Sequence, residues 1–319
     1  MQNSIFDKIK NANSITILTH AKTDGDAVGS ALAFFYYAKE QGKEVNVLID
    51  STIPSNLLWL PGIESINSKK VNGGDLAIVV DCATAERLGR NKFKLSSFKD
   101  TISVDHHQDN ERFAKLNLVK PGYSSTAEYV YDLFVKYDQE ISPDIARNIL
   151  VGILTDTGGL KFNSATPDTF RKVASLLEVV DKKADYFSMP LFQSLPHKLF
   201  MLKKYAYDNV KFYNNNEVAI FELSHEDLLK LDVDITDTKI ILDIALSLES
   251  IKLIGAICED SDGVNYVSLR SKCDVDVSKI AAKFGGGGHI QASGCKIIGD
   301  FKNATKIITD ALIKGLKEC

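Results

Sequence analysis

The sequence predicts an α/β fold in two parts: a parallel-sheet domain over residues 1–187 and a smaller α+β domain over residues 205–319, joined by a linker at 188–204. In the first part, short β-branched apolar runs alternate with segments of helical period, and several of these runs end in Asp or His. In the second part the pattern changes to closely spaced strand pairs. A chain of 319 residues is long enough for two such domains.

The first domain is expected to contain a parallel sheet. Residues 26–41 carry apolar side chains at helical spacing and are followed by Gly42, as at the end of a helix. An apolar run lies on each side, and strand, helix and strand in this order form a parallel βαβ unit with a right-handed crossover. The expected strands are 14–19, 44–49, 75–80 and 101–104. Further helices are expected at 124–137, 145–155 and 167–180.

The second domain is expected to contain mostly antiparallel strands. Residues 188–204 show no usable period, so they are assigned to the linker. Gly285–Gly288 form an unbroken glycine run directly before His289. The expected strands are 210–213, 217–223, 252–259, 264–270 and 294–298. The expected helices are 236–248, 275–284 and 304–315.

Composition restricts the possible partners and compartment. The net charge of −4 argues against a long electrostatic grip on duplex DNA, which needs many Lys and Arg contacts. The five cysteines are odd in number and form no CxxC pair, which indicates reduced thiols in a cytoplasm. No apolar run approaches the ~20 residues of a membrane span, and the first residues lack an apolar signal core. The sequence therefore predicts a cytoplasmic protein with no membrane partner.

Polar side chains gather where the predicted strands of the first domain end. They are His20, Asp24, Asp26, Asp81, Asp105, His106 and His107. The carboxyl ends of parallel strands meet at one edge of a sheet, where open α/β folds bind their ligands. Asp156, after a strongly apolar helix, can reach the same edge. We expect these groups to converge there.

Carboxylates this dense repel one another unless a cation neutralises them, so the set predicts divalent metal ions. The number of aspartates predicts two ions, and mixed Asp and His ligands favour Mn²⁺, with Fe²⁺, Co²⁺ or Zn²⁺ as alternatives. Two ions roughly 3.5–4 Å apart can clamp both oxygens of an in-line displacement at phosphorus. Asp81, alone after a central strand, is expected to bridge them.

Each residue also has a purely structural interpretation. Asp24 or Asp26 alone can cap the following helix, and Asp81 alone can be a turn residue. The glycine run alone can be a flexible turn, although glycines also let backbone N–H groups approach a phosphate closely. Arg270, at the end of a predicted strand, can supply a bidentate phosphate contact. Only the joint occurrence of the acids and imidazoles at strand ends favours a functional site.

The ordered motifs resemble the DHH phosphoesterase family with a DHHA1 domain. The first motif runs from His20 through Asp24-Gly25-Asp26 to Ser30, and Asp81, Asp105-His106-His107 and Asp156 follow in order. The glycine run with His289 resembles the DHHA1 motif. The two-domain length is similar to the NrnA-type oligoribonuclease and pAp phosphatase group, more than to the longer RecJ exonucleases.

The resemblance implies a role for each residue. His20, Asp24 and Asp81 would hold one metal ion, and Asp26, Asp81, His106 and Asp156 the other. His107 would contact the reacting phosphate, with Asp105 orienting an imidazole. Arg270, Gly287, Gly288 and His289 would bind a substrate phosphate from the second domain, so the resemblance implies an active site in the cleft between the domains. It also implies a homodimer.

The expected activity is hydrolysis of very short single-stranded oligoribonucleotides to mononucleotides, together with dephosphorylation of 3′-phosphoadenosine 5′-phosphate (pAp). A domain that grips a terminal phosphate at a fixed distance from the metals would favour short substrates. One alternative is a phosphodiesterase of dinucleotide signalling that acts on pApA or cyclic di-AMP. An inorganic pyrophosphatase shares the first motifs but not the glycine motif. A nucleotide-binding protein without catalysis is the alternative of a different class.

Overall fold

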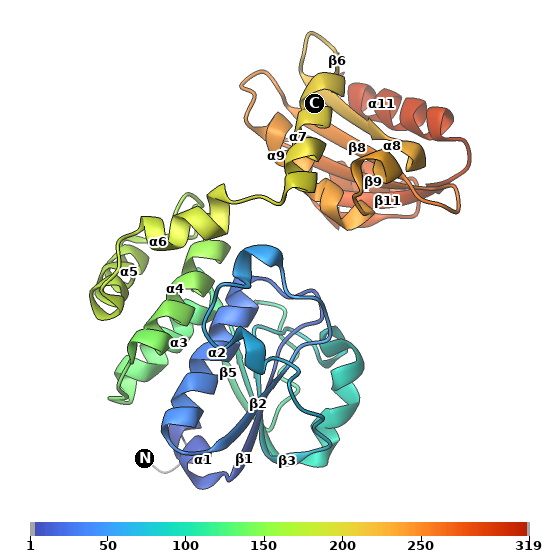
Figure 1. The fold of residues 1–319 in the computed structure, drawn as a ribbon. Coiled ribbons are helices and arrows are strands. Elements are labelled where there is room, and N and C mark those ends of the chain that lie inside the picture. Colours follow the sequence, from blue (N-terminus) through green and yellow to red (C-terminus); the bar gives the residue numbers. More distant parts are fainter. Residues whose placement is uncertain (1–3, 318–319) are drawn as a thin grey trace. The chain divides into compact units, whose positions relative to one another are not determined.

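The structure is a computed structural model that describes residues 4–317, apart from the side chains of Phe93 and Asp243. Its backbone contacts divide the chain into two units, residues 1–194 and 195–319 (Figure 1). Each unit has its own apolar core. Among residues 4–317, no helix is long and apolar enough to cross a membrane. Cys319, one of the predicted thiols, lies outside the described residues, and the other four cysteines are free.

The first unit is built on a parallel sheet with strand order β2-β1-β3-β4-β5 (Figure 1). Every neighbouring pair is parallel, as the sequence predicts. All carboxyl ends therefore lie at one edge. The strands are β1 (Ser14–Leu18), β2 (Glu44–Leu48), β3 (Gly74–Val80), β4 (Phe98–Asp105) and β5 (Leu116–Val119).

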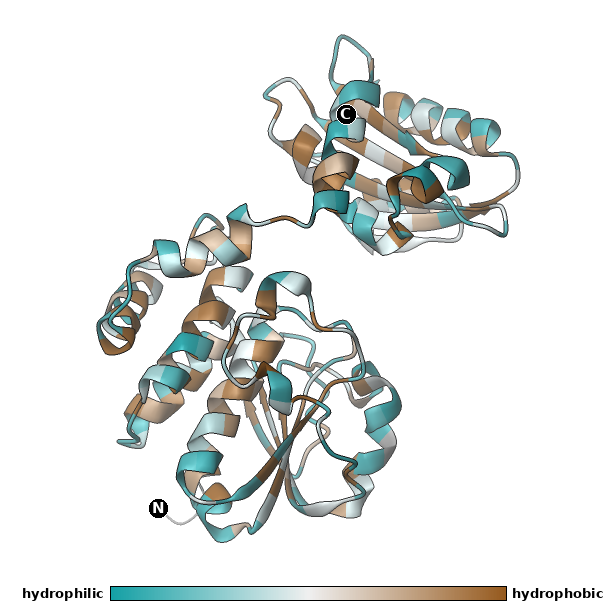
Figure 2. Ribbon diagram, in the orientation of Figure 1, coloured by the Kyte–Doolittle hydropathy of each residue, from teal (hydrophilic) through white to brown (hydrophobic). Residues whose placement is uncertain are grey.

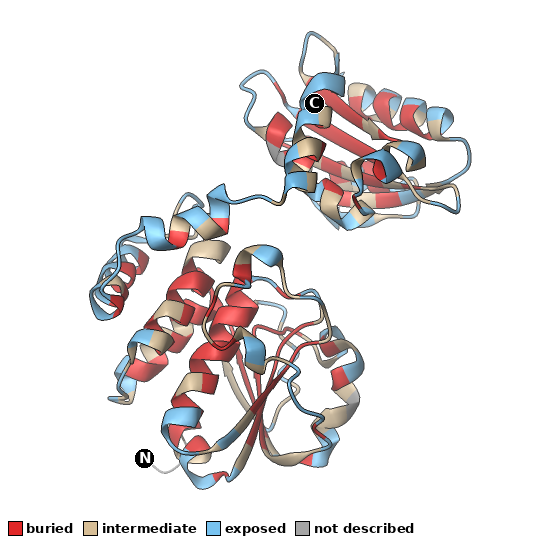
Figure 3. Cartoon of the chain, in the orientation of Figure 1, coloured by how far each residue is buried: buried red, intermediate tan, exposed pale blue. Residues whose placement is uncertain are grey.

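Helices cover both faces of this sheet. On one face α2 lies between the sheet and α4, and Figure 3 shows it buried along most of its length. On the other face η3 closes a smaller core that contains Leu88. The elements are α1 (Ile5–Asn11), α2 (Gly25–Glu40), η1 (Ser55–Leu57), η2 (Ile63–Ser65), η3 (Ala85–Ser97), α3 (Thr126–Lys136), α4 (Pro143–Asp156), α5 (Pro167–Val180), α6 (Asp185–Ser188) and η4 (Met189–Gln193).

The second unit contains a six-stranded sheet with order β10-β11-β9-β8-β7-β6. Only β7 and β8 pair in parallel, so the sheet is mostly antiparallel, as predicted. Figure 2 shows its central strands as hydrophobic. The elements are α7 (His197–Asn209), β6 (Lys211–Tyr213), β7 (Val218–Leu223), α8 (His225–Leu231), η5 (Ile235–Ile241), α9 (Leu242–Leu246), β8 (Leu253–Glu259), β9 (Val264–Ser271), α10 (Val277–Ala282), β10 (Gly287–His289), β11 (Ala292–Ile298) and α11 (Phe301–Lys317).

The structure differs from the sequence prediction at several places, including the short helices α1 and α8, which were not predicted. Three further differences concern the linker, the glycine run and one edge of the first sheet. The expected linker at 188–204 contains η4 and the start of α7, because Leu202 is buried in the core of the second unit. The glycine run is not simply a loop, since its last two glycines pair with β11 as part of strand β10. Strand β5 was not predicted, because it is a short edge strand whose residues are only half-buried.

Candidate active site

The carboxyl edge of the first sheet brings together all six predicted metal ligands. His20 follows β1, Asp81 directly follows β3, and His106 directly follows β4. Two helix ends add the remaining acids: Asp24 caps the start of α2 and is followed by Asp26, while Asp156 ends α4. Asp24 therefore fits both interpretations, because Oδ1 accepts the N–H of Ala27 while Oδ2 lies 3.9 Å from Nε2 of His20.

The donor atoms form three overlapping groups, each with its atoms within 4.8 Å of one another. The groups are His20 with Asp24 and Asp81, Asp26 with His106 and Asp156, and Asp81 with His106 and His107. Asp81 and His106 each belong to two groups. Mixed oxygen and nitrogen donors at this spacing are suited to divalent metal ions.

Asp81 lies at the centre of the groups. Its Oδ2 is 3.4 Å from Nε2 of His20, and its Oδ1 is 3.8 Å from Nε2 of His106 and 3.6 Å from Nδ1 of His107. Its φ of +51° is in the left-handed region, which costs free energy for most residues but is tolerated by Asp. Burial acts to raise the pKa of Asp81, but the hydrogen bond and charge of His20 lower it overall. Asp81 thus presents a charged oxygen to each side.

The hydrogen bonds of His106 suit a metal ligand. Its Nδ1 is 3.1 Å from the carbonyl oxygen of Tyr123, which can only accept, so Nδ1 carries the proton. Nε2 then has a lone pair, yet it faces Asp81 at 3.8 Å and Asp156 at 3.6 Å. Lone pairs that face carboxylates repel unless a cation lies among them. The donor set therefore fits a bound metal ion.

The charged forms of three acids at this edge are unfavourable without a cation. Burial and the neighbouring charge of Asp81 raise the pKa of Asp24, and the same causes raise that of Asp26 well above its usual range. Burial raises the pKa of Asp156 to about 6, with Asp81 and Asp24 acting in the same direction against the lowering effect of His106. Bound divalent ions would favour the charged carboxylates at neutral pH.

Asp26 is held by the start of α3. Its Oδ2 accepts the N–H of Thr126 at 2.7 Å, and its Oδ1 accepts the N–H of Ala127 at 2.8 Å. The hydroxyl of Thr126 donates to Oδ1 of Asp81 at 2.9 Å. Gly152 of α4 makes room for this arrangement, since a Cβ there would lie 2.4 Å from Cβ of Ala127 and 2.9 Å from Oδ1 of Asp26.

Asp105 organises the other imidazole. Its Oδ1 lies 2.8 Å from Nδ1 of His107 and also accepts the backbone N–H of His106 at 2.9 Å. Its Oδ2 accepts from the amide of Asn110 at 2.6 Å. The hydrogen bond to Asp105 raises the pKa of His107, with the nearby charge of Asp81 acting in the same direction. Nδ1–H of His107 thus points to Asp105, and Nε2 is left for another partner.

A buried lysine holds the loop before α3. Lys172 of α5 is 8% exposed, and its ammonium contacts Glu128 at 3.1 Å and Asp132 at 2.8 Å. Glu128 accepts from the backbone N–H and the hydroxyl of Ser124, at 3.0 and 2.6 Å. Asp132 accepts from the hydroxyl of Tyr123 at 2.7 Å, and the ammonium lies 5.0 Å from the ring centroid of Tyr123. This network fixes the loop that supplies the carbonyl partner of His106.

Sequence reasoning missed four of these supporting residues: Asn110, Tyr123, Thr126 and Lys172. Thr126 lies in the predicted helix 124–137, and the sequence carries no signal that links it to Asp81; the residue that caps this helix is Ser125. Lys172 has helical spacing on α5 but no sequence signal that links it to the loop. Only the position of Asn110, soon after the paired histidines, could have drawn attention to it.

In the second unit the predicted phosphate-binding residues lie on one sheet face. Arg270 on β9 is directly opposite Ala292 on β11, and Ala292 is directly opposite His289 on β10. Directly opposed residues point to the same face, so the small Ala292 separates an imidazole from a guanidinium. The glycines permit close approach of the strands, since a Cβ on Gly288 would lie 2.6 Å from the carbonyl oxygen of Ala292. Gly287 is exposed beside them.

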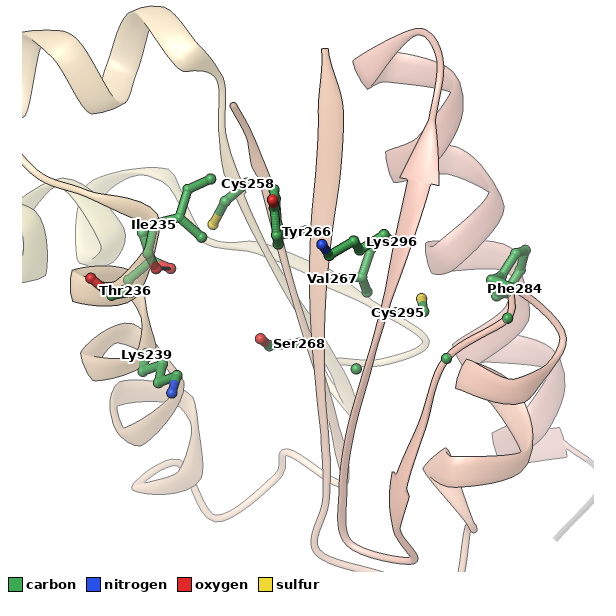
Figure 4. A pocket seen from close by; sticks show the side chains of 14 residues that line it. Ile235, Thr236, Lys239, Cys258, Tyr266, Val267, Ser268, Phe284, Cys295 and Lys296 are labelled. Atoms are coloured by element: carbon green, nitrogen blue, oxygen red, sulfur yellow. Dashed lines mark hydrogen bonds between the residues drawn. The ribbon is translucent and has the colours of Figure 1, made fainter. Parts of the chain in front are cut away.

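A cavity of about 540 Å³ lies beside the strands that carry Arg270, Ala292 and His289. Figure 4 shows it between η5, which carries Thr236 and Lys239, and strands β9 and β11. Ser268 on β9 and Gly294 on β11 line the cavity and are directly opposite each other. Ser268 is two residues from Arg270 on β9, and Gly294 is two residues from Ala292 on β11, so all four lie on the same face of the sheet. The second unit therefore offers a cavity, lined by both polar and apolar groups, beside the predicted phosphate contacts.

Two family models match most of the chain. The model for the DHH family, N-terminal domain, matches residues 14–153, and that for the DHHA1 domain matches residues 215–314. These ranges contain five of the six predicted metal ligands, all except Asp156, as well as the glycine run.

Named relatives and a solved structure resemble the chain over nearly its full length. A bifunctional oligoribonuclease and PAP phosphatase NrnA from Thermus thermophilus is 32% identical, covering 95% of this chain and 90% of the relative. A probable bifunctional oligoribonuclease and PAP phosphatase NrnA from Streptococcus mutans is 29% identical, covering 91% and 92%. The crystal structure of an exopolyphosphatase-related protein from Bacteroides fragilis has a TM-score of 0.87 at 28% identity, covering 97% and 94%. This chain belongs to the DHH family, with a DHHA1 domain in its second unit.

Proposed function

We propose that this protein is a metal-dependent phosphoesterase that hydrolyses very short oligoribonucleotides to mononucleotides and removes phosphate from pAp. The observation that carries the proposal is the position of Asp81, which presents one oxygen to His20 and the other to His106 and His107. A pure binding protein has no need of this costly cluster of buried acids. The names of the relatives at 29–32% identity support the substrates.

The ligand sets are those that the family resemblance implies, and the groups His20–Asp24–Asp81 and Asp26–His106–Asp156 support them. His20, Asp24 and Asp81 would hold one ion, and Asp26, Asp81, His106 and Asp156 the other. When bound, two divalent ions supply positive charge that stabilises both the attacking and the leaving oxygen of an in-line displacement at phosphorus. Mixed carboxylate and imidazole ligands favour Mn²⁺ as the working ion.

His107 would act on the substrate itself. Its Nδ1–H donates to Asp105, which fixes the ring and favours the protonated imidazole. Its side chain is 30% exposed, so Nε2 can reach a ligand. A protonated Nε2 would donate a hydrogen bond to an oxygen of the reacting phosphate and stabilise its developing charge.

The second unit would select the substrate by its terminal phosphate. Arg270 offers a planar fork of N–H donors, which matches phosphate oxygens, and His289 lies on the same sheet face. A grip on a terminal phosphate favours short, phosphate-ended molecules over long chains. The net charge of −4 is consistent with this preference, because long nucleic acids need a basic track.

The test is phosphate release from pAp and mononucleotide release from a diribonucleotide. The metal-stripped chain should be inactive on both, and Mn²⁺ should restore hydrolysis of both. Arg270→Lys should raise KM more than it lowers kcat, because it removes bidentate binding rather than the metal site. The proposal is wrong if the Mn²⁺-loaded chain leaves both substrates intact.

A further inference from the structure

A second cavity lies in the first unit, at the carboxyl end of β2. Its volume is about 300 Å³, and its polar lining includes Asp50, Arg90, Asn91, Lys69, Lys70 and Lys94. β2 pairs in parallel with β1, and Leu48 is directly opposite Leu18. The cavity is therefore at the same edge of the sheet as His20, one strand along, where strands are about 4.8 Å apart.

The cavity carries excess positive charge on an acidic chain. Its one carboxylate, Asp50, is already matched, since it accepts from the backbone N–H of Arg90 at 2.8 Å and from Nε of Arg90 at 2.7 Å. Among the described residues, no ion pair or hydrogen bond involves the ammonium groups of Lys69, Lys70 or Lys94. Among the described residues, Lys69 and Lys70 therefore have no partner, and the charge of Lys94 acts only on Asp50, which Arg90 already neutralises.

A buried amide provides an independent observation. Asn91 lines the cavity and is only 8% exposed. Because Asn91 lines the cavity, its amide N–H group is a neutral donor that a ligand in the cavity can reach.

The backbone connects this cavity to the metal cluster. The N–H of Ala21, next to His20, donates to the carbonyl of Arg87 at 2.7 Å. Gly89 has a φ of +60°, and a Cβ there would lie 3.0 Å from Cβ of Ala21 and 2.5 Å from Oδ2 of Asp50. His20 and Arg90 are thus each one residue away from this close contact. The lining of the cavity and a metal ligand are therefore neighbours at the same edge of the sheet.

We propose that this cavity binds a phosphate group of the substrate beyond the reacting phosphate and the terminal phosphate, with Lys69, Lys70, Lys94 and Asn91 as donors. The proposal rests on the function proposed above and deepens it, since it assigns a subsite to substrates that carry at least three phosphates. Lysine ammonium groups and an amide N–H match the acceptor oxygens of a phosphate. pAp carries only two phosphates, so it would leave the cavity empty.

The test compares two substrates on one variant, Lys69→Gln/Lys70→Gln/Lys94→Gln. We expect the ratio of KM for a 5′-phosphorylated triribonucleotide to KM for pAp to rise about tenfold, because exposed ionic contacts are individually weak but three are lost together. Lys10→Gln/Lys136→Gln/Lys183→Gln removes the same net charge elsewhere and should leave the ratio unchanged. An unchanged ratio in the first variant, or an equal rise in the control, would overturn the proposal.

A binding measurement separates this proposal from the proposed function. Calorimetry with inorganic phosphate on the metal-stripped chain should detect one site in the wild type that the lysine variant lacks. This result would support an anion site even if neither nucleotide were hydrolysed, in which case the proposed function alone would fail. Loss of phosphate binding with an unchanged KM ratio would assign the cavity to free phosphate and contradict a substrate subsite. Equal binding by both proteins would overturn the anion site itself.

Discussion

At the scale of single residues, the site consists of acids whose charged forms are unfavourable without a cation. Asp24, Asp26 and Asp156 all have raised pKa values because they are buried near one another and near Asp81. Asp81 differs because His20 and the two other imidazoles favour its charge. The three acids with raised pKa values therefore oppose the folding of the metal-free chain at neutral pH.

This opposition predicts how metal stabilisation depends on pH. A carboxyl whose folded-state pKa is raised keeps its proton longer when folded, so the metal-free chain should lose stability as pH rises from about 4 through the value of about 6 at Asp156. Metal binding needs the charged ligands. The rise in Tm on adding Mn²⁺ should therefore be larger at about pH 7.5 than at about pH 5.

Thermal melts in chelator and in Mn²⁺ measure this difference. Asp156→Asn removes one titrating ligand, so its metal-free form should show a weaker dependence of Tm on pH. A metal-induced rise in Tm that is the same at both pH values would contradict the proposed ligands.

At the scale of secondary-structure elements, α3 and α5 support the proposed metal ligands without contributing a ligand themselves. α3 presents the N–H groups that hold Asp26, and Lys172 on α5 holds the loop that orients His106. Although burial acts to lower the pKa of Lys172, its hydrogen bonds to Asp132, Asp168 and Glu128 raise it above the usual range. Lys172 therefore remains positively charged and keeps its ion pairs.

Lys172→Met should weaken metal binding without touching a ligand. The change leaves Glu128 buried and unpaired, so the loop before α3 should lose its fixed position. We expect the affinity for Mn²⁺ to fall about tenfold or more, as for other partners of metal ligands. Calorimetric titration of the metal-stripped protein measures this affinity.

Arg171→Met is the matched control, since the neighbouring Arg171 is exposed and its only ion pair among the described residues is with Asp168, at 3.8 Å. Glu128→Gln combined with Lys172→Met removes the unpaired charge and should recover part of the metal affinity. Equal effects of Lys172→Met and Arg171→Met on metal affinity would show that the buried network does not position the site.

The crossing of α2 and α4 requires a glycine. A Cβ on Gly29 would lie 2.4 Å from the carbonyl oxygen of Asn148, which is backbone and cannot move aside. Gly29→Ala should lower the free energy of unfolding by about 1–3 kcal/mol, as overpacking does. Gly315→Ala should be neutral or slightly stabilising, because the nearest atom is a flexible methyl of Ile280 at 3.1 Å. If urea unfolding shows that Gly29→Ala and Gly315→Ala lower the free energy of unfolding equally, this packing argument is contradicted.

The elements also show what sequence can predict. The strand ends that carry His20, Asp81 and His106 could be predicted because the apolar runs stop at ionisable residues. The structure brings these three residues together. Strand β5 and helix α7 were missed because their burial depends on neighbours far along the chain. The support from Lys172 was missed for the same reason, since its partner Glu128 is 44 residues away.

At the scale of the whole molecule, the two units supply different parts of one proposed activity. The first unit contains the metal cluster and the lysine-lined cavity, and the second contains Arg270 and His289 on one sheet face. The first unit is a parallel sheet with its ligands at the carboxyl edge, where open α/β folds bind substrates. The division predicts that substitutions at the metal cluster change mainly kcat, and those at Arg270 mainly KM.

The most direct test is hydrolysis of an end-labelled RNA ladder, from dimer to long oligomer, alongside pAp with Mn²⁺. The account predicts rapid cleavage of the shortest oligomers and of pAp, and a loss of more than about a hundredfold in Asp81→Asn, which keeps a residue type that tolerates positive φ. Asp109→Asn, an exposed acid near the same loop, should retain full activity. Cleavage that is independent of RNA length, or that survives Asp81→Asn, would contradict the account.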